Sequence, residues 1–257
     1  MSRNQLVQSL SRGLFILDQI ARSDDGLTLQ DLSRNVGLKP TTAHNLVRTL
    51  ISHGFLEKTP RPVRYRVGTS LDDLAGLRRK KLILRRVPVA LRMLCDSLDR
   101  ATVVFAQIVG GDILKSMRIN AERPAVIEYP QGVSQHPYVS ASALLIQSLW
   151  SEEERVAYRD RYPFLEYGAH VWGTQERFDE QMEAVRRNGY AVVDIDKGGV
   201  FKVAAPVTGP DGQVLAAIGA NIPLERASGP QRRRLVEEVL KAAANLSARA
   251  AGNARKS

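Results

Sequence analysis

The sequence predicts an α+β protein in two parts: an N-terminal winged helix-turn-helix, and a larger domain with an antiparallel sheet flanked by helices. Before residue 69, three short segments carry apolar residues at helical spacing, and two strand-like segments follow them. After residue 69, paired strand-like segments alternate with longer helical ones. At 257 residues the chain is long enough to hold two cores.

The segment from Lys39 to His53 has two distinct faces when it is placed on a helical wheel. Apolar side chains share one side, and they are Ala43, Leu46, Val47 and Leu50. Polar side chains share the other, and they are Thr41, His44, Asn45 and Arg48. Pro40 suits the first helical turn and Gly54 suits the residue after the last. The segment is therefore predicted to pack on one side and to leave a polar stripe free on the other.

Two further helices are predicted upstream of this one. Thr28 begins a capping signal. The apolar stripe that follows consists of Leu29, Leu32 and Val36, and Gly37 then allows a tight turn. In the first helix the apolar residues at helical spacing are Val7, Leu10, Leu14, Leu17 and Ala21. Three small helices can thus share one core.

A basic hairpin is predicted after the helices. Strand-forming residues occupy 55–58 and 63–67, and turn residues occupy 59–62 between them. Arg61, Arg64 and Arg66 offer guanidinium groups that suit phosphates or a minor groove.

The helix-turn-helix and the hairpin together predict DNA binding. A free helix face with Asn and Arg can read base edges while a basic ribbon holds the backbone. The residues expected to contact DNA are Thr28, Lys39, Thr41, Thr42, His44, Asn45, Arg48, Arg61, Arg64 and Arg66. The alternative interpretation of the polar stripe is an ordinary solvated helix face.

Positive charge is concentrated in the N-terminal part. The net charge is +10 at pH 7. Residues 1–82 hold 14 Lys and Arg against 7 Asp and Glu, a net of +7, and the remaining residues hold 23 against 20, a net of +3. Such a distribution suits a polyanionic partner. Because there is no apolar stretch of the roughly 18 residues that span a bilayer and no apolar signal core, we expect a cytoplasmic protein without a membrane partner.

Little in the sequence indicates metal or cofactor chemistry. The single cysteine, Cys95, excludes an internal disulfide, and its spacing with Leu91, Leu94 and Leu98 predicts a place in a helix core. No His, Glu and Cys spacing resembles a metal site. Glycines at 110–111 and 198–199 lie between strands, where they serve turns rather than phosphate binding. We expect no metal, no cofactor and no catalytic residue.

The second part is predicted to begin with a linker helix over residues 69–86 and to continue as a domain over 87–250. Hairpins are predicted for 102–109 with 113–119 and for 190–196 with 200–207, and a further strand for 213–222. Helical patterns cover 87–98, 141–150, 152–161, 174–188 and 230–250. We expect five or six antiparallel strands with helices over one face, and a frayed tail over 251–257.

Several segments, taken in order, match one known pattern. Residues 38–50 look like a recognition-helix segment and residues 65–68 like the end of its wing, while 189–191 followed by 203–207 look like an effector-domain signature. In these segments the chain resembles the IclR family of bacterial transcription regulators. The resemblance implies a winged helix, a linker helix and a GAF-like ligand-sensing domain. It also implies homodimers, or homotetramers built as dimers of dimers, on palindromic operators of double-stranded DNA, with repression as the usual outcome.

Two segments depart from the family pattern. Asn45 stands where the family commonly has arginine, which changes the expected base preference rather than the groove-binding role. Ala141 and Ser142 stand where the family has a Gly-Lys pair, which alters the expected ligand environment.

By the resemblance, effector contacts are expected at Ala141, Ser142, Asp194 or Asp196, Lys202, Gly219 and Asn221. From the residues themselves, Asp194 and Asp196 share one strand face, and Lys202 lies on the face opposite Phe201. A Lys202 ammonium that lines a pocket would pair with a ligand carboxylate, so the hypothesis is a small organic acid. The alternatives are two aspartates that face water and a lysine that reaches water from a strand edge.

The sequence therefore predicts a sequence-specific transcriptional regulator whose operator affinity responds to a small-molecule effector, and not an enzyme. Two other classes of function stay open. One is a DNA-targeted enzyme that uses Asp194 and Asp196 as acid and base. The other is a nucleic-acid binder without sequence preference, driven by charge alone.

Overall fold

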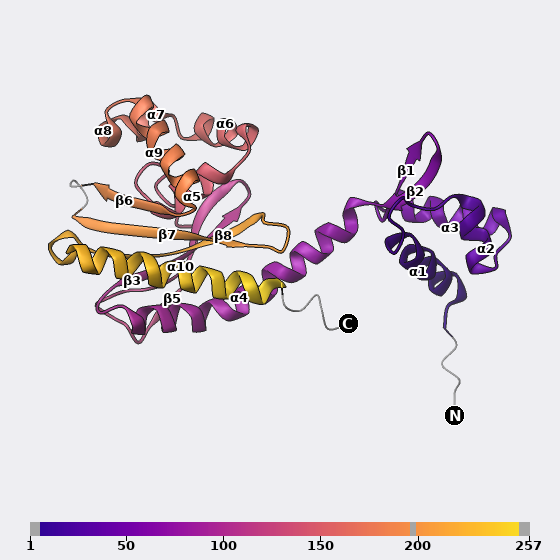
Figure 1. The fold of residues 1–257 in the computed structure, drawn as a ribbon, viewed down its shortest axis with the longest axis horizontal. Helices are drawn as coiled ribbons and strands as arrows, with labels where there is room; N and C mark the ends of the chain where they lie inside the picture. Colours follow the sequence, from indigo (N-terminus) through magenta and orange to yellow (C-terminus); the bar gives the residue numbers. More distant parts are fainter. Residues whose placement is uncertain (1–5, 196–198, 252–257) are drawn as a thin grey trace. The chain divides into compact units, whose positions relative to one another are not determined.

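The computed structural model describes residues 6–195 and 199–251. It divides into two compact units, residues 1–78 and residues 79–257. The first unit contains α1 (Gln8–Ala21), α2 (Leu29–Val36), α3 (Pro40–Ser52), β1 (Leu56–Pro60) and β2 (Val63–Val67). β1 and β2 form an antiparallel hairpin, so the predicted order of three helices followed by a hairpin is confirmed (Figure 1).

The start of α2 shows how the sequence determines a helix boundary. The Thr28 hydroxyl oxygen accepts a hydrogen bond from the Asp31 backbone N–H at 3.2 Å, and the Asp31 carboxylate accepts one from the Thr28 backbone N–H at 3.2 Å. Two N–H groups that the first helical turn would leave unpaired are thus satisfied. At the other end Gly37 has φ +66°, a left-handed conformation that ends the helix and opens the turn to α3.

The core of this unit differs from the prediction at α1. The buried residues of α1 are Gly13, Ile16 and Ile20, and the two isoleucines join a cluster with Leu32, Val47, Leu56 and Tyr65. Leu10 and Leu14, which belong to the predicted stripe, instead lie on the surface and are 62% and 57% exposed. Apolar residues cover more than half of this helix's circumference, so spacing alone does not select which side packs.

A single helix, α4 (Thr69–Ser97), follows β2. The sequence indicated two separate segments, 69–86 and 87–98, but the helix continues through Pro88. Ile83, Val87, Leu91 and Leu94 form one buried stripe on both sides of that proline. Tertiary packing therefore supports the helix although proline removes one backbone donor.

The second unit is built on a six-stranded sheet in the order β5-β4-β3-β8-β7-β6. Its strands are β3 (Thr102–Val109), β4 (Asp112–Ile119), β5 (Ile127–Glu128), β6 (Ala191–Ile195), β7 (Val200–Thr208) and β8 (Val214–Pro223). Every neighbouring pair is antiparallel. The two predicted hairpins and the strand after them are confirmed, and β5 is an addition.

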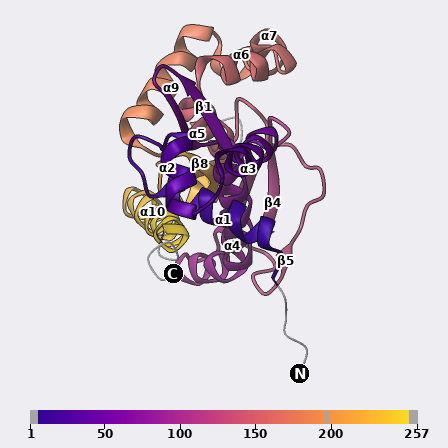
Figure 2. The same cartoon turned by 90° about the vertical axis from the view of Figure 1, so that its right-hand side faces the viewer.

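Helices cover both faces of this sheet rather than the single face that was predicted. The remaining helices are α5 (Ala141–Leu149), α6 (Glu152–Arg161), α7 (Phe164–Tyr167), α8 (Ala169–Trp172), α9 (Gln175–Asn188), the 3-10 turn η2 (Leu224–Arg226) and α10 (Gly229–Ala251). Figure 1 shows α10 and the later part of α4 below the strands, with α5 and α9 above them, and Figure 2 repeats this order from the side.

Each face has its own core. On the α10 side, Phe201, Val203 and Val207 of β7 pack with residues of α4 and α10, and Cys95 lies in this cluster as predicted. On the α5 side, Ala204 packs with α5 and α9. The buried residues of α9 are Phe178, Met182 and Val185. Because alternate residues of a strand point to opposite faces, one strand serves both cores.

Within residues 6–195 and 199–251, no helix combines the length and the apolar character needed to cross a membrane.

Candidate functional site

The polar stripe predicted on the helix-turn-helix lies on the surface of α3. Ala43 and Val47 are buried against the other helices, which directs the opposite side of α3 outward. The exposed polar side chains are Lys39, Thr41, Thr42, His44, Asn45 and Arg48. Within the part of the chain that the structure describes, these side chains have no hydrogen-bond or ion-pair partner. They are therefore available to a partner molecule.

The other predicted DNA contacts are engaged within the first unit to different degrees. Arg64 donates a hydrogen bond to the Gly26 carbonyl oxygen at 2.8 Å, and Arg66 donates one to the Asp25 carbonyl oxygen at 3.4 Å. The Thr28 hydroxyl caps α2. Arg61, in the turn of the hairpin, has no partner among the described residues. Arg61 is thus the wing arginine whose five donors are all free for phosphate.

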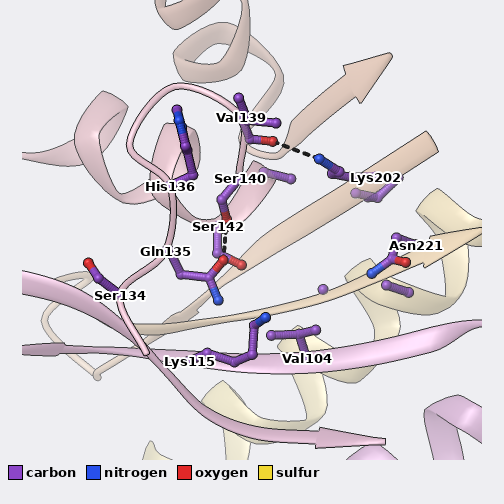
Figure 3. Close-up of a pocket in the computed structure, with 14 residues that line it drawn as sticks. Val104, Lys115, Ser134, Gln135, His136, Val139, Ser140, Ser142, Lys202 and Asn221 are labelled. Carbon is purple, nitrogen blue, oxygen red and sulfur yellow. Dashed lines mark hydrogen bonds between the residues drawn. The ribbon is translucent and has the colours of Figure 1, made fainter. Parts of the chain in front are cut away.

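A cavity of about 340 Å³ opens on the α5 face of the second unit. Its walls come from β3, β4, β7, β8, the start of α5 and the segment before α5 (Figure 3). The lining residues are Val104, Lys115, Ser134, Gln135, His136, Val139, Ser140, Ala141, Ser142, Lys202, Val203, Gly219, Ala220 and Asn221. The volume falls within the range of small-molecule sites.

The cavity brings together five of the predicted effector contacts, namely Ala141, Ser142, Lys202, Gly219 and Asn221. Lys202 of β7 pairs with Asn221 of β8 in the sheet register, so both side chains point to the same face. Gly219 forms part of the floor, where a Cβ would lie 2.5 Å from the Val203 carbonyl oxygen. Only glycine fits there without moving the backbone.

Asp194 is not part of this cavity, which corrects its sequence-based assignment. Asp194 is the register partner of Phe201 and so faces α10, away from Lys202. Its carboxylate accepts a hydrogen bond from Arg232 of α10, whose guanidinium lies 4.6 Å from the centre of the Phe201 ring. The reason is the strand period of two, because Asp194 and Lys202 occupy positions of opposite parity across the pairing. Asp196, the other predicted position, lies outside the described residues.

Sequence reasoning missed Lys115, and a β-bulge explains why. Phe105 pairs with Met117 while the next residue, Ala106, pairs with Lys115, so Ser116 is an extra residue in β4. Before the bulge Ile113 and Lys115 face the α5 side, and after it Met117 faces the α10 side. Regular alternation would have placed Lys115 and Met117 on one face, and the sequence carries no signal that a bulge interrupts the alternation.

The segment before α5 was also missed as a set of lining residues. Gln135 donates its backbone N–H to the Ile113 carbonyl oxygen at 2.7 Å, and Lys115 donates its own to the Val133 carbonyl oxygen at 2.9 Å. These bonds hold the segment along the outer edge of β4. Tyr138 N–H donates to His136 Nδ1 at 3.2 Å, so the neutral imidazole carries its proton on Nε2.

The charges that line the cavity are cationic. Burial lowers the pKa of Lys202, and the nearby Lys115 lowers it further. Burial also lowers the pKa of Lys115 and of His136. Among the described residues that line the cavity there is no carboxylate. The Lys202 ammonium donates instead to a neutral partner, the Val139 carbonyl oxygen, at 3.2 Å.

The N-terminus of α5 adds to this positive potential. The Ser140 hydroxyl oxygen accepts a hydrogen bond from the Ala143 N–H at 3.4 Å and caps the helix. Ala141 and Ser142, the first two residues of α5, line the cavity. Backbone N–H groups of a first helical turn carry partial positive charge and favour anions.

Comparison with known proteins identifies the family. A model of the IclR helix-turn-helix domain matches residues 9–60, and a model of the bacterial transcriptional regulator IclR C-terminal domain matches residues 78–248. The chain belongs to the IclR family of bacterial transcriptional regulators. It is 23% identical to the HTH-type transcriptional regulator XynR of Escherichia coli K12, over 94% of this chain and 96% of that protein.

Two solved structures of IclR-type proteins share the fold. The repressor BlcR of Agobacterium tumefaciens is 22% identical, with a TM-score of 0.53 over 94% of this chain and 96% of that one. An IclR homolog of Microbacterium hydrocarbonoxydans, complexed with 4-hydroxybenzoate, is 20% identical, with a TM-score of 0.50 over 93% and 98%.

Membership of the IclR family makes the chain a DNA-binding transcriptional regulator, which confirms the prediction from sequence. The family and the class of function follow from the matched domains. The individual DNA contacts, the ligand and the assembly depend on the surfaces described above.

Proposed function

We propose that this IclR-family regulator binds a small organic acid in the cavity at Lys202 and that the acid changes its affinity for an operator. The observation that carries this proposal is the charge of the cavity. Two half-buried lysines and the N-terminus of α5 line it, and none of its described lining residues is acidic.

The lysines favour an anion because their burial is uncompensated. A half-buried ammonium loses hydration, and the lowered pKa of Lys202 reflects that cost. A ligand carboxylate would supply the missing opposite charge and a charge-assisted hydrogen bond. The Asn221 amide on the same face can bind another polar group of the ligand. The 4-hydroxybenzoate held by an IclR homolog of the same fold is itself an organic acid.

On the DNA side, we assign base contacts to the exposed polar residues of α3 and a phosphate contact to Arg61. A dimer would place two such helices in successive major grooves of a palindromic operator. Exposed apolar side chains just before α1 and in its first half offer a surface for a second copy, and they are Leu6, Val7, Leu10 and Leu14, each 57–78% exposed. A protein that acts on bacterial operators is expected in the cytoplasm.

Effector and operator binding must influence each other in this scheme. A ligand that binds one arrangement of the dimer better than another shifts the population toward it. DNA then changes the affinity for the acid by the same factor by which the acid changes the affinity for DNA. This reciprocity lets the same coupling be measured from either side, through DNA affinity or through acid affinity.

The test uses the full-length protein and a duplex selected from a random pool for tight binding. Fluorescence anisotropy measures DNA affinity with a panel of small carboxylic acids, each paired with its neutral amide. We expect at least one acid, but not its amide, to change the affinity.

Lys202→Met tests the site itself, with Lys241→Met as the control, since Lys241 lies exposed on α10. We expect Lys202→Met to weaken acid binding by about tenfold or more, as for a lost charged hydrogen bond, with DNA affinity unchanged in the absence of acid. An amide as effective as its acid, or a full response in Lys202→Met, would contradict the proposal.

A further inference from the structure

We propose that the cavity has a second anion-binding subsite, formed by Lys115 and Gln135, and that the effector is a short-chain dicarboxylate that reaches from this subsite to Lys202. The inference rests on the proposed function, because it assigns the class of acid that the same cavity takes.

Lys115 has no counter-ion of its own among the residues that the structure describes. Its side chain is half-buried in the cavity wall, and within residues 6–195 and 199–251 its ammonium makes no hydrogen bond or ion pair. The charge of Glu128 raises the pKa of Lys115, against the larger effects of burial and of Arg118, which lower it. That carboxylate already accepts hydrogen bonds from Arg118 at 2.7 Å and from Arg123 at 2.6 Å. Glu128 is therefore neutralised by two arginines, and Lys115 adds unpaired charge to the cavity.

Gln135 supplies an unpaired donor beside Lys115. The residue is 8% exposed, and its side-chain Nε2 has no hydrogen-bond partner among the described residues. Its Oε1 accepts a hydrogen bond from the Ser140 hydroxyl at 2.6 Å. The Ser140 oxygen also accepts from the Ala143 N–H while its proton is donated to Gln135 Oε1, so the amide nitrogen lies on the side away from Ser140. Figure 3 shows the amide nitrogen turned toward Lys115.

A buried donor without a partner is unfavourable, and native proteins seldom retain one without a reason. Here the donor and the ammonium converge on one wall of a cavity that has no acidic residue among its described lining. Together they match the two oxygens of a carboxylate, one oxygen to each group.

The two subsites lie at different ends of the cavity. Lys115 comes from β4 and Lys202 from β7, and β3 and β8 lie between these strands. Three strand spacings of about 4.8 Å amount to roughly 14 Å across the sheet, and the register also places Lys115 level with Pro206 rather than Lys202. The two backbones are therefore farther apart than about 14 Å, and the lysine side chains narrow the gap from both sides. Figure 3 shows the two ammonium groups on opposite sides of the open space. One carboxylate at Lys202 leaves Lys115 unpaired, whereas a dicarboxylate satisfies both ends.

The experiment compares acids of equal chain length with the full-length protein, by isothermal titration calorimetry. Succinate, glutarate and adipate are each measured against butyrate, valerate and hexanoate. We expect one dicarboxylate to bind about tenfold or more tightly than its monocarboxylate partner, as for one added charged contact. Equal affinities within every pair would overturn the proposal.

The variants separate the two ends of the cavity. Lys115→Met should reduce dicarboxylate affinity to that of the matched monocarboxylate and leave monocarboxylate affinity unchanged. Gln135→Leu should act in the same direction with a smaller loss, which provides a second route should either variant fold poorly. Lys202→Met should weaken both classes of acid. A Lys115→Met protein that loses both classes equally would refute a separate subsite.

The outcomes also distinguish this inference from the proposed function. Monocarboxylates and dicarboxylates that bind equally, with a loss in Lys202→Met, would support the organic-acid effector and reject the second subsite. No binding of either class would reject the short-chain dicarboxylate, and the panel of acids and amides would then decide the proposed function by itself.

Discussion

The replacement of Arg48 by alanine tests whether α3 reads bases. Arg48 is exposed, and its guanidinium has no partner within the described residues, while the neighbouring Val47 anchors the helix in the core. Alanine is at least as good a helix former as arginine. The substitution should therefore leave the stability of the first unit unchanged, so its whole effect appears in DNA binding.

The size of the effect depends on what Arg48 contacts. A bidentate contact to a base discriminates by about 1–3 kcal/mol, which is a loss of roughly 5- to 150-fold on the selected duplex with little change on random DNA. A phosphate contact instead weakens both DNAs alike and lowers the slope of log K against log salt by about 0.9. We expect the first pattern.

Anisotropy titrations at three salt concentrations, on the selected and on a random duplex, separate these patterns. Arg22→Ala is the matched control, because Arg22 follows α1 and its guanidinium is held by Asp18 at 2.9 Å. Equal losses on both duplexes would refute a base contact by Arg48. No loss on either duplex would refute the placement of α3 at the DNA.

Three further predictions follow from local geometry. Thr28→Ala should destabilise the first unit by about 1 kcal/mol in urea unfolding. Hydrogen bonds with Thr28 lower the pKa of Asp31. The resulting stabilisation of the folded state is present at neutral pH and is lost as the pH falls through the folded-state pKa of Asp31. The difference in unfolding free energy between Thr28→Ala and wild type should therefore narrow in acid. Gly219→Ala should lower stability by about 1–3 kcal/mol, because its Cβ would meet the Val203 carbonyl oxygen, whereas Gly13→Ala, with open space around its Cβ, should raise it by about 0.5–1 kcal/mol. Acid binding should weaken as the pH rises through the pKa of Lys202, which lies below 10.5, and a calorimetric pH series should lose this dependence in Lys202→Met.

The sequence predicted the features that depend on neighbouring residues. Capping at Thr28, the helix start at Pro40 and the two-faced pattern of α3 are local properties, and all three are present. The position of Lys202 opposite Phe201 is likewise local, because strand alternation determines it.

The features that were missed depend on partners far along the chain. α1 has apolar residues on more than one side, and contacts with Leu32 and Tyr65 determine which side is buried. The assignment of Asp194 failed because its face depends on the pairing of β6 with β7 and on Arg232 of α10. Lys115 was missed because pairing with β3, rather than residue pattern, places the extra residue at Ser116.

The bulge at Ser116 means that the electrostatics of the cavity depend on a residue count as well as on residue types. If β4 paired with β3 without this bulge, regular alternation would place Lys115 and Met117 on the same side of the sheet. Either the cavity would lose an ammonium or the α10 core would lose a methionine. A one-residue shift in the pairing of β4 can thus alter which ligands this scaffold accepts without any substitution inside the cavity, a route to new specificity that comparison of the lining residues alone would overlook.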